Sequence, residues 1–266
     1  MVNMGSTYIK MMRRGVKNTF ARFMSILAIV ALGTGFLGGL LATTPDMHLT
    51  VDDYYDRHSL FDIYVNGTLG LTDSDVEALK ALDAVDRAMP ADVTDVIMDT
   101  SNGSYVTRVY GVDFSTYGTE EFLNDFELFE GRLPMDADEC IVVVPNEYSE
   151  HHSLGEKLTI SPENTDYESR SDTYAYDSME IVGLIRHPQY MSINSEPTTV
   201  GTGELNIIAY VPIEFYSLEV YTDIYITVAG AEELDTFSDS YIDRIDEVTA
   251  ALEDFGVERS EIRTNE

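Results

Sequence analysis

The residues that could do chemistry in this chain do not combine into a catalytic or metal-binding set. His151 and His152 are adjacent, and neighbouring side chains converge neither on a helix nor on a strand, so a solvated turn is favoured over a metal site. Cys140, the single cysteine, enters an apolar run and is expected to be a buried small hydrophobic residue rather than a nucleophile. Asp99 to Gly103 and Asp136 to Glu139 lack the twelve-residue register of a calcium loop.

The sequence also contains no motif for phosphate binding and no recognisable pair of residues for acid–base catalysis. No Gly-Lys pair occurs in the sequence, which excludes a phosphate-binding loop of the Walker type. Gly201-Thr202-Gly203 is a lone fragment in a polar segment, and we expect a turn there. Paired carboxylates carry no information in a chain with 48 of them. The sequence therefore predicts no catalytic residues, no cofactor and no metal, and we do not expect an enzyme.

The amino-acid composition limits the kinds of molecule that this protein can bind. The chain of 266 residues has 16 Lys and Arg against 48 Asp and Glu, a net charge of −32, which argues against a nucleic-acid partner because phosphate backbones are held by clustered cations. A hydrophobic content of 44% suffices for an ordinary core. The acidic surface could attract cationic peptides or metal ions, but the acids are scattered singly, which favours simple solvation.

The charge is divided unevenly along the chain. Residues 46–266 hold 11 basic and 48 acidic side chains, a net of −37, while residues 1–45 hold no acid at all. A basic head, an uncharged stretch and an acidic body are typical of a chain that crosses a membrane. The net charge of the head is +5, from Lys10, Arg13, Arg14, Lys17 and Arg22.

The uncharged stretch predicts a transmembrane helix over residues 23–42. These 20 predominantly apolar residues cover about 30 Å as a helix, the thickness of the bilayer core. The basic residues 1–22 should then stay in the cytoplasm, with everything after residue 42 on the outside of the cell membrane. A cleavable signal peptide is less favoured, because its apolar run would be shorter and would end at a small-x-small site, not at Thr43-Thr44-Pro45.

One face of this helix carries small residues. Ala31, Gly35 and Gly39 recur every four positions, a spacing that lets another membrane helix approach closely. Glycine is also commoner in membrane helices in general, so background composition is an equal alternative. A packing face would require helices that this chain does not contain.

The outside part alternates strand-like and helix-like pieces. A helix continues to His58, and another follows the capping pattern of Thr72 and Asp75. Asn102-Gly103 predicts a tight hairpin between two strands. The fold class is α+β: one N-terminal transmembrane helix, then an extracytoplasmic domain over residues 43–230 with a largely antiparallel or mixed sheet. The strands are expected at Phe61 to Val65, Val93 to Met98, Tyr105 to Val112, Cys140 to Val144, Lys157 to Ile160, Glu180 to Ile185, Asn206 to Val211 and Asp223 to Val228.

The last segment, residues 231–266, predicts an acidic helix. Tyr241, Ile245, Val248, Leu252 and Phe255 fall near heptad spacing, and Gly256 is expected to end the helix. Docking on the domain, a coiled coil and a return to the membrane remain open.

A series of short motifs also runs through residues 20–230 in order. It begins with Ala31-Leu32-Gly33-Thr34-Gly35-Phe36 in the apolar span. It continues with Tyr54-Tyr55-Asp56, Asp62-Ile63, Thr68-Leu69-Gly70-Leu71-Thr72, Glu130-Gly131-Arg132-Leu133-Pro134, Leu154-Gly155, Val182-Gly183-Leu184-Ile185, Pro188-Gln189-Tyr190 and Tyr210-Val211-Pro212. The series resembles the FtsX-like permeases of ABC transporters, whose best-described outside domain is the MacB-type periplasmic core. Gly155-Glu156 departs from the usual Gly-Asp.

The resemblance implies a role without chemistry of its own. A separate cytoplasmic ABC ATPase would hydrolyse ATP, and the permease, with further permease helices or a second permease copy in the membrane lipid, would move the outside domain for export, lipoprotein release or control of a cell-wall enzyme. Gly131, Arg132 and Pro134 carry over as a structural turn. Such permeases have three or more further membrane helices, so the chain looks like the N-terminal part of one. The alternative is a single-pass membrane-anchored extracytoplasmic binding protein.

Overall fold

The computed structural model describes residues 4–144, 152–191 and 196–265, and the chain divides into two units, residues 1–51 and 52–266. Helix α1 spans Met4–Arg57. Its residues up to Val51 form the first unit, and residues 52–57 belong to the second. The part of α1 from Thr19 to Arg57 has a mean hydropathy of 2.1 in its most apolar window, none of it buried. By length and composition this helix can cross a membrane, as the sequence predicts.

The second unit is built from nine described strands and two helices. Helix α2 (Asp73–Lys80) follows the first strand, and α3 (Asp239–Asn265) follows the last. The sheet is mixed, because β3 pairs with β8 and β5 with β7 in parallel while the other pairs are antiparallel. The strands are β1 (Ile63–Leu71), β2 (Val85–Thr100), β3 (Gly103–Val112), β4 (Glu127–Gly131), β5 (Glu139–Val143), β6 (Lys157–Ile160), β7 (Ser178–Arg186), β8 (Ile207–Pro212) and β9 (Tyr221–Val228).

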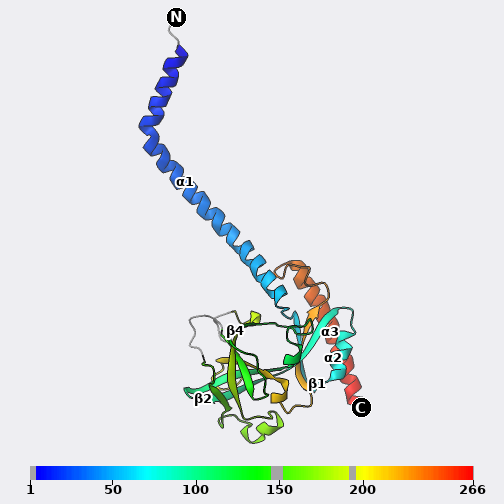
Figure 1. Cartoon of the computed structure of the whole chain (residues 1–266). Coiled ribbons are helices and arrows are strands. Elements are labelled where there is room, and N and C mark those ends of the chain that lie inside the picture. The colour runs from blue at the N-terminus through cyan, green and yellow to red at the C-terminus, as the bar shows by residue number, and fades with distance from the viewer. Residues whose placement is uncertain (1–3, 145–151, 192–195, 266) are drawn as a thin grey trace. The chain divides into compact units, whose positions relative to one another are not determined.

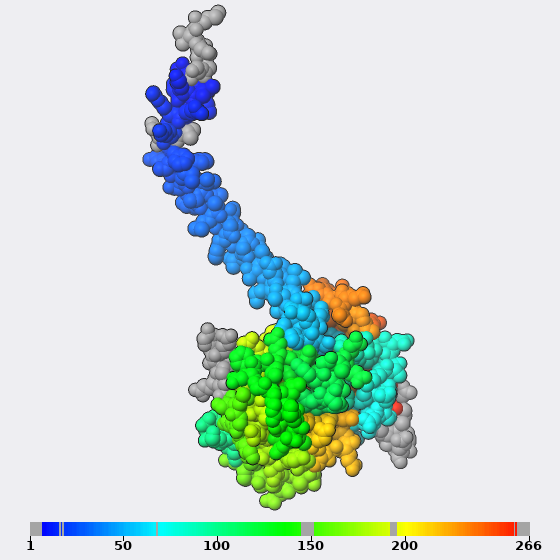
Figure 2. Space-filling model, viewed as in Figure 1, coloured from blue at the N-terminus to red at the C-terminus, as the bar shows by residue number. Residues whose placement is uncertain are grey.

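Strand β2 belongs to two sheets and joins them. Its first half pairs with β9, which pairs with β1, and its second half pairs with β3. From β3 the pairing runs through β8, β5, β7 and β6 and returns to β2. Six described strands therefore close into a ring, which leaves few unpaired strand edges. Strand β4 lies at an edge beside β7 and is exposed along its length; the green segment that contains it faces the viewer in Figure 2.

Three apolar clusters hold the second unit together. One fills the ring, with fully buried Met98, Leu158 and Phe215. The second lies outside the ring against the segment that contains Phe122 and Phe126. The third covers one face of the β1–β9–β2 sheet with α2 and α3, which lie side by side in Figure 1.

Most predicted elements are confirmed. The hairpin pairs Thr100 with Gly103 around the expected turn, and the expected strands other than β1 and β2 occur within a few residues of their predicted bounds. Thr72 and Asp75 form the capping pattern, with the Thr72 N–H donating to Asp75 Oδ2 at 2.8 Å. Gly201 and Gly203 both have positive φ in a turn, as expected.

Three predictions about boundaries are wrong. Strand β1 runs to Leu71 rather than ending at Val65. Gly256 does not end α3, because it does not take the positive φ that a terminating glycine needs, and the helix continues to Asn265. Strand β2 begins at Val85 rather than Val93, although it contains Pro90. The first half of β2 pairs with β9 alone, so Pro90 lies on an edge where its missing N–H costs no pairing. Sequence reasoning also missed β4, whose exposed residues do not alternate.

Helix α3 docks on the domain rather than standing free. Val248 and Leu252 are buried in the same cluster as Val76 and Leu79 of α2. Arg259 adds an ion pair to Asp75 at 2.9 Å. Of the alternatives left open for residues 231–266, docking describes the part of the segment that forms α3.

Candidate functional site at the end of helix α1

The small residues of α1 lie on an open surface of the helix. A Cβ atom added at Gly35 or Gly39 would meet nothing within 4 Å, and the same holds for Gly33 and Gly38. Ala31 is exposed on the same helix. Within the described residues of the first unit, therefore, the face with Ala31, Gly35 and Gly39 has room for a neighbouring helix backbone and carries none.

Gly131, Arg132 and Pro134 come together in one turn after β4. Gly131 has φ +85°, and a Cβ there would lie 2.3 Å from the Val182 carbonyl oxygen. The Arg132 N–H donates to that same oxygen at 3.0 Å. Pro134 is buried. The turn thus places the backbone of β4 directly against β7, where only glycine fits.

Glu139 completes this turn, and sequence reasoning gave it no role. Arg132 binds its carboxylate through both terminal nitrogens, one at 2.6 Å. The Met135 N–H donates to Glu139 Oε2 at 2.8 Å. The Arg132 guanidinium is the main cause that lowers the pKa of Glu139 to about 2. The arrangement is structural, because every partner of the carboxylate comes from the same turn.

The junction, residues 52–62 with the segments that they contact, is where α1 meets the sheet domain. It contains more hydrogen bonds than the turn at Gly131. After α1 ends at Arg57, the His58 and Ser59 carbonyls accept from the N–H groups of Asp125 and Asn124 at 2.8 and 2.9 Å. Asn124 Oδ1 accepts in turn from the Phe61 N–H at 2.9 Å. Asn124 is buried and takes φ +59°, a conformation that asparagine tolerates better than most residues.

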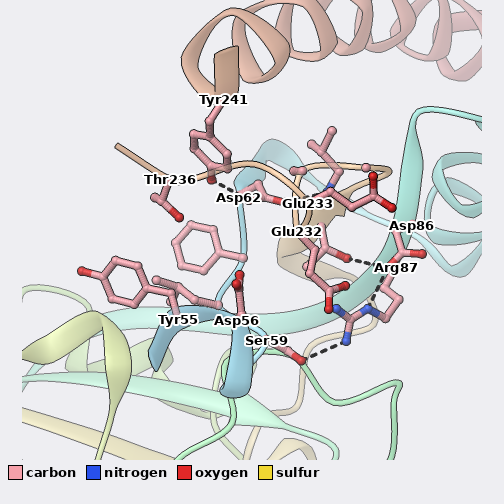
Figure 3. Close-up of a pocket in the computed structure, with 16 residues that line it drawn as sticks. Tyr55, Asp56, Ser59, Asp62, Asp86, Arg87, Glu232, Glu233, Thr236 and Tyr241 are labelled. Carbon is pink, nitrogen blue, oxygen red and sulfur yellow. Dashed lines mark hydrogen bonds and ion pairs between the residues drawn. The ribbon is translucent and has the colours of Figure 1, made fainter. Parts of the chain in front are cut away.

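Two aspartates bind the junction to β9, to α3 and to the segment between them. Asp52 Oδ1, in α1, accepts from the Thr236 N–H at 2.7 Å. Asp62 accepts from the Val228 N–H at 2.7 Å and from the Tyr241 hydroxyl at 2.5 Å; Figure 3 shows the Tyr241 hydroxyl pointing at Asp62. Burial raises the pKa of Asp62, and these two hydrogen bonds oppose the rise.

A small acidic pocket of about 220 Å³ lies at this junction (Figure 3). Arg87 is the cation among its lining residues, and it donates to Ser59 Oγ at 3.0 Å, to Asp86 at 3.0 Å and to the Glu120 carbonyl at 3.3 Å. The carboxylates that line the pocket are Asp56, Asp62, Asp86, Glu232 and Glu233. The volume of this pocket is below that of typical ligand sites. Arg87 instead links Ser59, two residues after the end of α1, to Glu120 in the loop before β4.

The residues singled out for chemistry stay apart. Cys140 is fully buried inside the ring of strands, and burial raises the pKa of its thiol, so it behaves as a small hydrophobic residue as expected. His152 Nδ1 lies 3.0 Å from Glu156 Oε2, and His151 falls outside the described residues. Within residues 4–144, 152–191 and 196–265, no three His, Cys, Asp or Glu side chains form a group that could hold a metal ion.

Sequence reasoning missed the junction because its members are remote from one another. Asn124 and Phe61 are separated by 63 residues, and Asp52 and Thr236 by 184. None of them belongs to a motif with a recognisable spacing. The one available signal was Asp62, a carboxylate beside an apolar strand, which needs a hydrogen-bonding partner when it is buried.

Comparison with known proteins assigns most of the chain to a protein family. A family model described as the MacB-like periplasmic core domain matches residues 23–242. No curated protein sequence matches the chain. The periplasmic region of MacB from Actinobacillus actinomycetemcomitans is 13% identical, with 71% of this chain and 75% of that one covered and a TM-score of 0.36. The extracellular domain of the noncanonic ABC-type transporter YknZ from Gram-positive bacteria is 12% identical, with coverages of 69% and 87% and a TM-score of 0.36.

The family match extends from the apolar part of α1 into the start of α3, and so includes β1 to β9 and the whole junction. It covers well over half of the chain. The protein therefore belongs to the family of the MacB-like periplasmic core domain, and it carries that domain behind an N-terminal helix long enough to span a membrane.

Proposed function

We propose that the chain is the N-terminal portion of an ABC transporter permease subunit that passes movement from a cytoplasmic ATPase to an extracytoplasmic domain. Residues 1–22 are cytoplasmic and residues 23–42 cross the membrane in this proposal, because the +5 head precedes the apolar run and the acidic body follows it. Membership of the MacB-like family supports the extracytoplasmic place of the sheet domain. The chain supplies force transmission and no bond-making step.

The observation that carries the proposal is the junction. The last residues of α1, from Asp52 to Arg57, belong to the same unit as the sheet domain. This end is held by hydrogen bonds to two remote segments, the loop around Asn124 and the turn around Thr236. A displacement of the end of α1 would therefore be passed to these segments through the bonds.

The partners follow from this role. ATP hydrolysis is assigned to a separate cytoplasmic ABC ATPase, and the open face with Gly35 and Gly39 is assigned to further permease helices or to a second permease copy in the lipid. The resulting movement of the domain would serve export, lipoprotein release or control of a cell-wall enzyme.

Co-purification tests the proposal. The full chain, tagged at its C-terminus, is purified from membranes of its native host after mild cross-linking, and vanadate-sensitive ATP hydrolysis is measured in the eluate. We expect an ATP-hydrolysing protein to accompany the chain in stoichiometric amount. As a matched control, Leu37→Val changes the opposite side of the same helix from Gly35 and Gly39 and should retain the partner.

Purification of the intact chain without any ATP-hydrolysing partner, under conditions that preserve other ABC complexes of the same membrane, would contradict the proposal. That result would favour a membrane-anchored extracytoplasmic binding protein instead.

A further inference from the structure

A groove larger than the junction pocket lies on the opposite face of the β1–β9–β2 sheet from α2 and α3. Its volume is about 640 Å³, within the range of sites for small organic ligands. Residues at alternate positions of four adjacent strands form its floor, since side chains two apart on a strand share a face. These are Tyr64 and Asn66 of β1, Asp223 and Tyr225 of β9, Val93 and Asp95 of β2, and Arg108 and Tyr110 of β3.

Three aromatic rings form a corner at one end of the groove. The rings of Phe61 and Tyr64 are perpendicular, with centroids 6.1 Å apart, and the Tyr225 ring lies 4.9 Å from Phe61 at an angle of 49°. Tyr64 is 60% exposed, so the core does not account for its position. The exposed Tyr64 ring therefore offers an aromatic face at this end of the groove, and the face of an aromatic ring attracts an organic cation.

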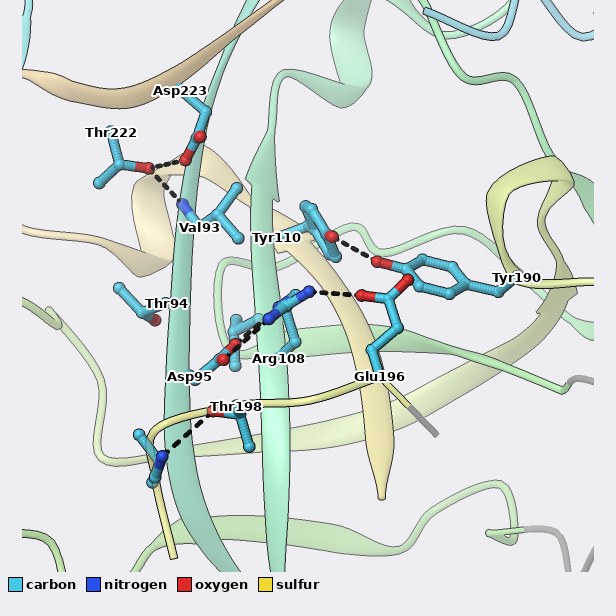
Figure 4. A network of polar contacts seen from close by, with 12 residues as sticks. Val93, Thr94, Asp95, Arg108, Tyr110, Tyr190, Glu196, Thr198, Thr222 and Asp223 are labelled. Atoms are coloured by element: carbon cyan, nitrogen blue, oxygen red, sulfur yellow. Dashed lines mark hydrogen bonds and ion pairs between the residues drawn. The ribbon is translucent and has the colours of Figure 1, made fainter. Parts of the chain in front are cut away.

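The polar side chains of the groove carry excess negative charge. Arg108 binds Asp95 through two bonds of 2.7 and 2.9 Å and Glu196 through a third of 2.7 Å, so its single positive charge meets two carboxylates (Figure 4). Asp223 accepts from Asn66 at 3.2 Å and from Thr222 at 2.7 Å, and both donors are neutral. The charged residues of the groove therefore sum to −2, with Asp223 directly across the strand pair from Asn66 and beside the aromatic corner.

We propose that this groove is a binding site for an organic ammonium ion, held by the face of the exposed Tyr64 ring and by the charge of Asp223, with Phe61 and Tyr225 also lining the groove. A neutral ligand of the same shape would gain the apolar contact but not the attraction to ring faces and carboxylate. An anion would be repelled by the net charge of the groove.

The field of the whole domain favours the same ligand. Residues 52–266 contain 11 basic and 47 acidic side chains, a net of 11 − 47 = −36. Such a field raises the local concentration of cations near the surface, and the aromatic corner then selects those with an apolar substituent. This inference goes beyond the proposed function, because binding at the groove requires no ATPase.

Saturation-transfer difference NMR on the full chain in dodecyl maltoside tests it with two isosteric probes, tetramethylammonium and tert-butanol. We expect saturation of the tetramethylammonium methyl signal and little of the tert-butanol signal. Tyr64→Ala and Asp223→Asn should each weaken tetramethylammonium binding at least about fivefold in a titration. Tyr64 is exposed and asparagine is isosteric with aspartate, so both variants should fold, which circular dichroism verifies.

Matched controls separate the groove from general attraction to an acidic protein. Asp83→Asn removes the same charge at an exposed position outside the groove, and Tyr176→Ala removes a partly exposed ring elsewhere on the domain. Both should bind tetramethylammonium as the unchanged chain does. Equal saturation of the two probes would overturn the proposal, as would folded Tyr64→Ala and Asp223→Asn variants that bind as well as the controls.

Discussion

Gly131 and Gly155 illustrate two different reasons why a position requires glycine: a positive φ alone, or a positive φ together with close contact to another strand. Both have positive φ, +85° and +81°, but an added Cβ at Gly131 would lie 2.3 Å from the Val182 carbonyl, while at Gly155 it would meet nothing. Gly131→Ala should lower the free energy of unfolding by about 2 to 4 kcal/mol, and Gly155→Ala by only about 1 to 2 kcal/mol. Urea unfolding of the full chain in neutral detergent measures both, and equal losses would show that contact with β7 is unimportant.

Asp92 gives the stability of the domain a pH dependence of defined sign. It is 3% exposed, and burial raises its pKa to about 6, with the nearby Asp223 adding to the rise. A raised folded-state pKa means that the stabilising contribution is complete below the unfolded pKa of about 4 and is lost as pH rises through about 6. Charged Asp92 therefore destabilises the fold at neutral pH, despite the Thr222 N–H that donates to it at 3.2 Å.

Asp92→Asn removes this ionisation and keeps the acceptor oxygen. We expect the variant to exceed the unchanged chain in free energy of unfolding by about 1 to 3 kcal/mol at pH 8 and to match it near pH 4. Unfolding curves at both pH values measure the difference. Asp83→Asn, at an exposed position, should show no such pH-dependent gain. A gain for Asp92→Asn that is equal at the two pH values would contradict the assignment.

Among the elements, α1 carries the proposed packing face for another membrane helix. A leucine at Gly35 or Gly39 would still suit a membrane helix, because leucine is at least as apolar as glycine on insertion scales. It would, however, fill the space where a neighbouring backbone should approach. Gly35→Leu and Gly39→Leu should therefore insert normally but lose at least half of the co-purifying ATPase activity.

The comparison for these two variants is Leu37→Val on the opposite side of the same helix. Membrane fractionation and vanadate-sensitive ATP hydrolysis in the eluate are the two measurements. If the glycine variants assemble as well as Leu37→Val, the small residues reflect only background composition.

Strand β2 is the element that organises the sheet domain. Because its two halves pair with different strands, it links the sheet under α2 and α3 to the closed ring. The groove is lined by residues from the second half of β2. The junction pocket is lined by Asp86 and Arg87 from its first half. Strand β1 itself contributes Tyr64 and Asn66 to the groove, so a change in β1 reaches the groove directly.

At the scale of the whole molecule, the charge asymmetry predicts the orientation in the membrane. Single cysteines at Thr7 and Ser101 of the Cys140→Ala protein are exposed to a membrane-impermeant thiol reagent in intact cells. We expect labelling at Ser101, on the exposed turn between β2 and β3, and none at Thr7 until the cells are opened. Labelling at Thr7 but not at Ser101 in intact cells is incompatible with the proposed topology.

Several features of the protein could be read from the sequence because their causes are local. Twenty apolar residues without a charge predict a membrane-spanning helix whatever surrounds them, and Asn102-Gly103 predicts its hairpin from backbone conformation alone. The capping pair Thr72 and Asp75 acts within a single helical turn. In each case the interacting residues are close in the chain.

The tertiary structure alone decided the rest. The ring closes because β6 meets β2 some sixty residues away, and nothing in either segment marks the other as its partner. The exposed strand β4 and the edge position of Pro90 depend on which strands lie beside them. The junction and the groove combine residues from β1 and β9, about 160 positions apart, and such remote pairings are selected by packing and burial of the whole domain rather than by local preference.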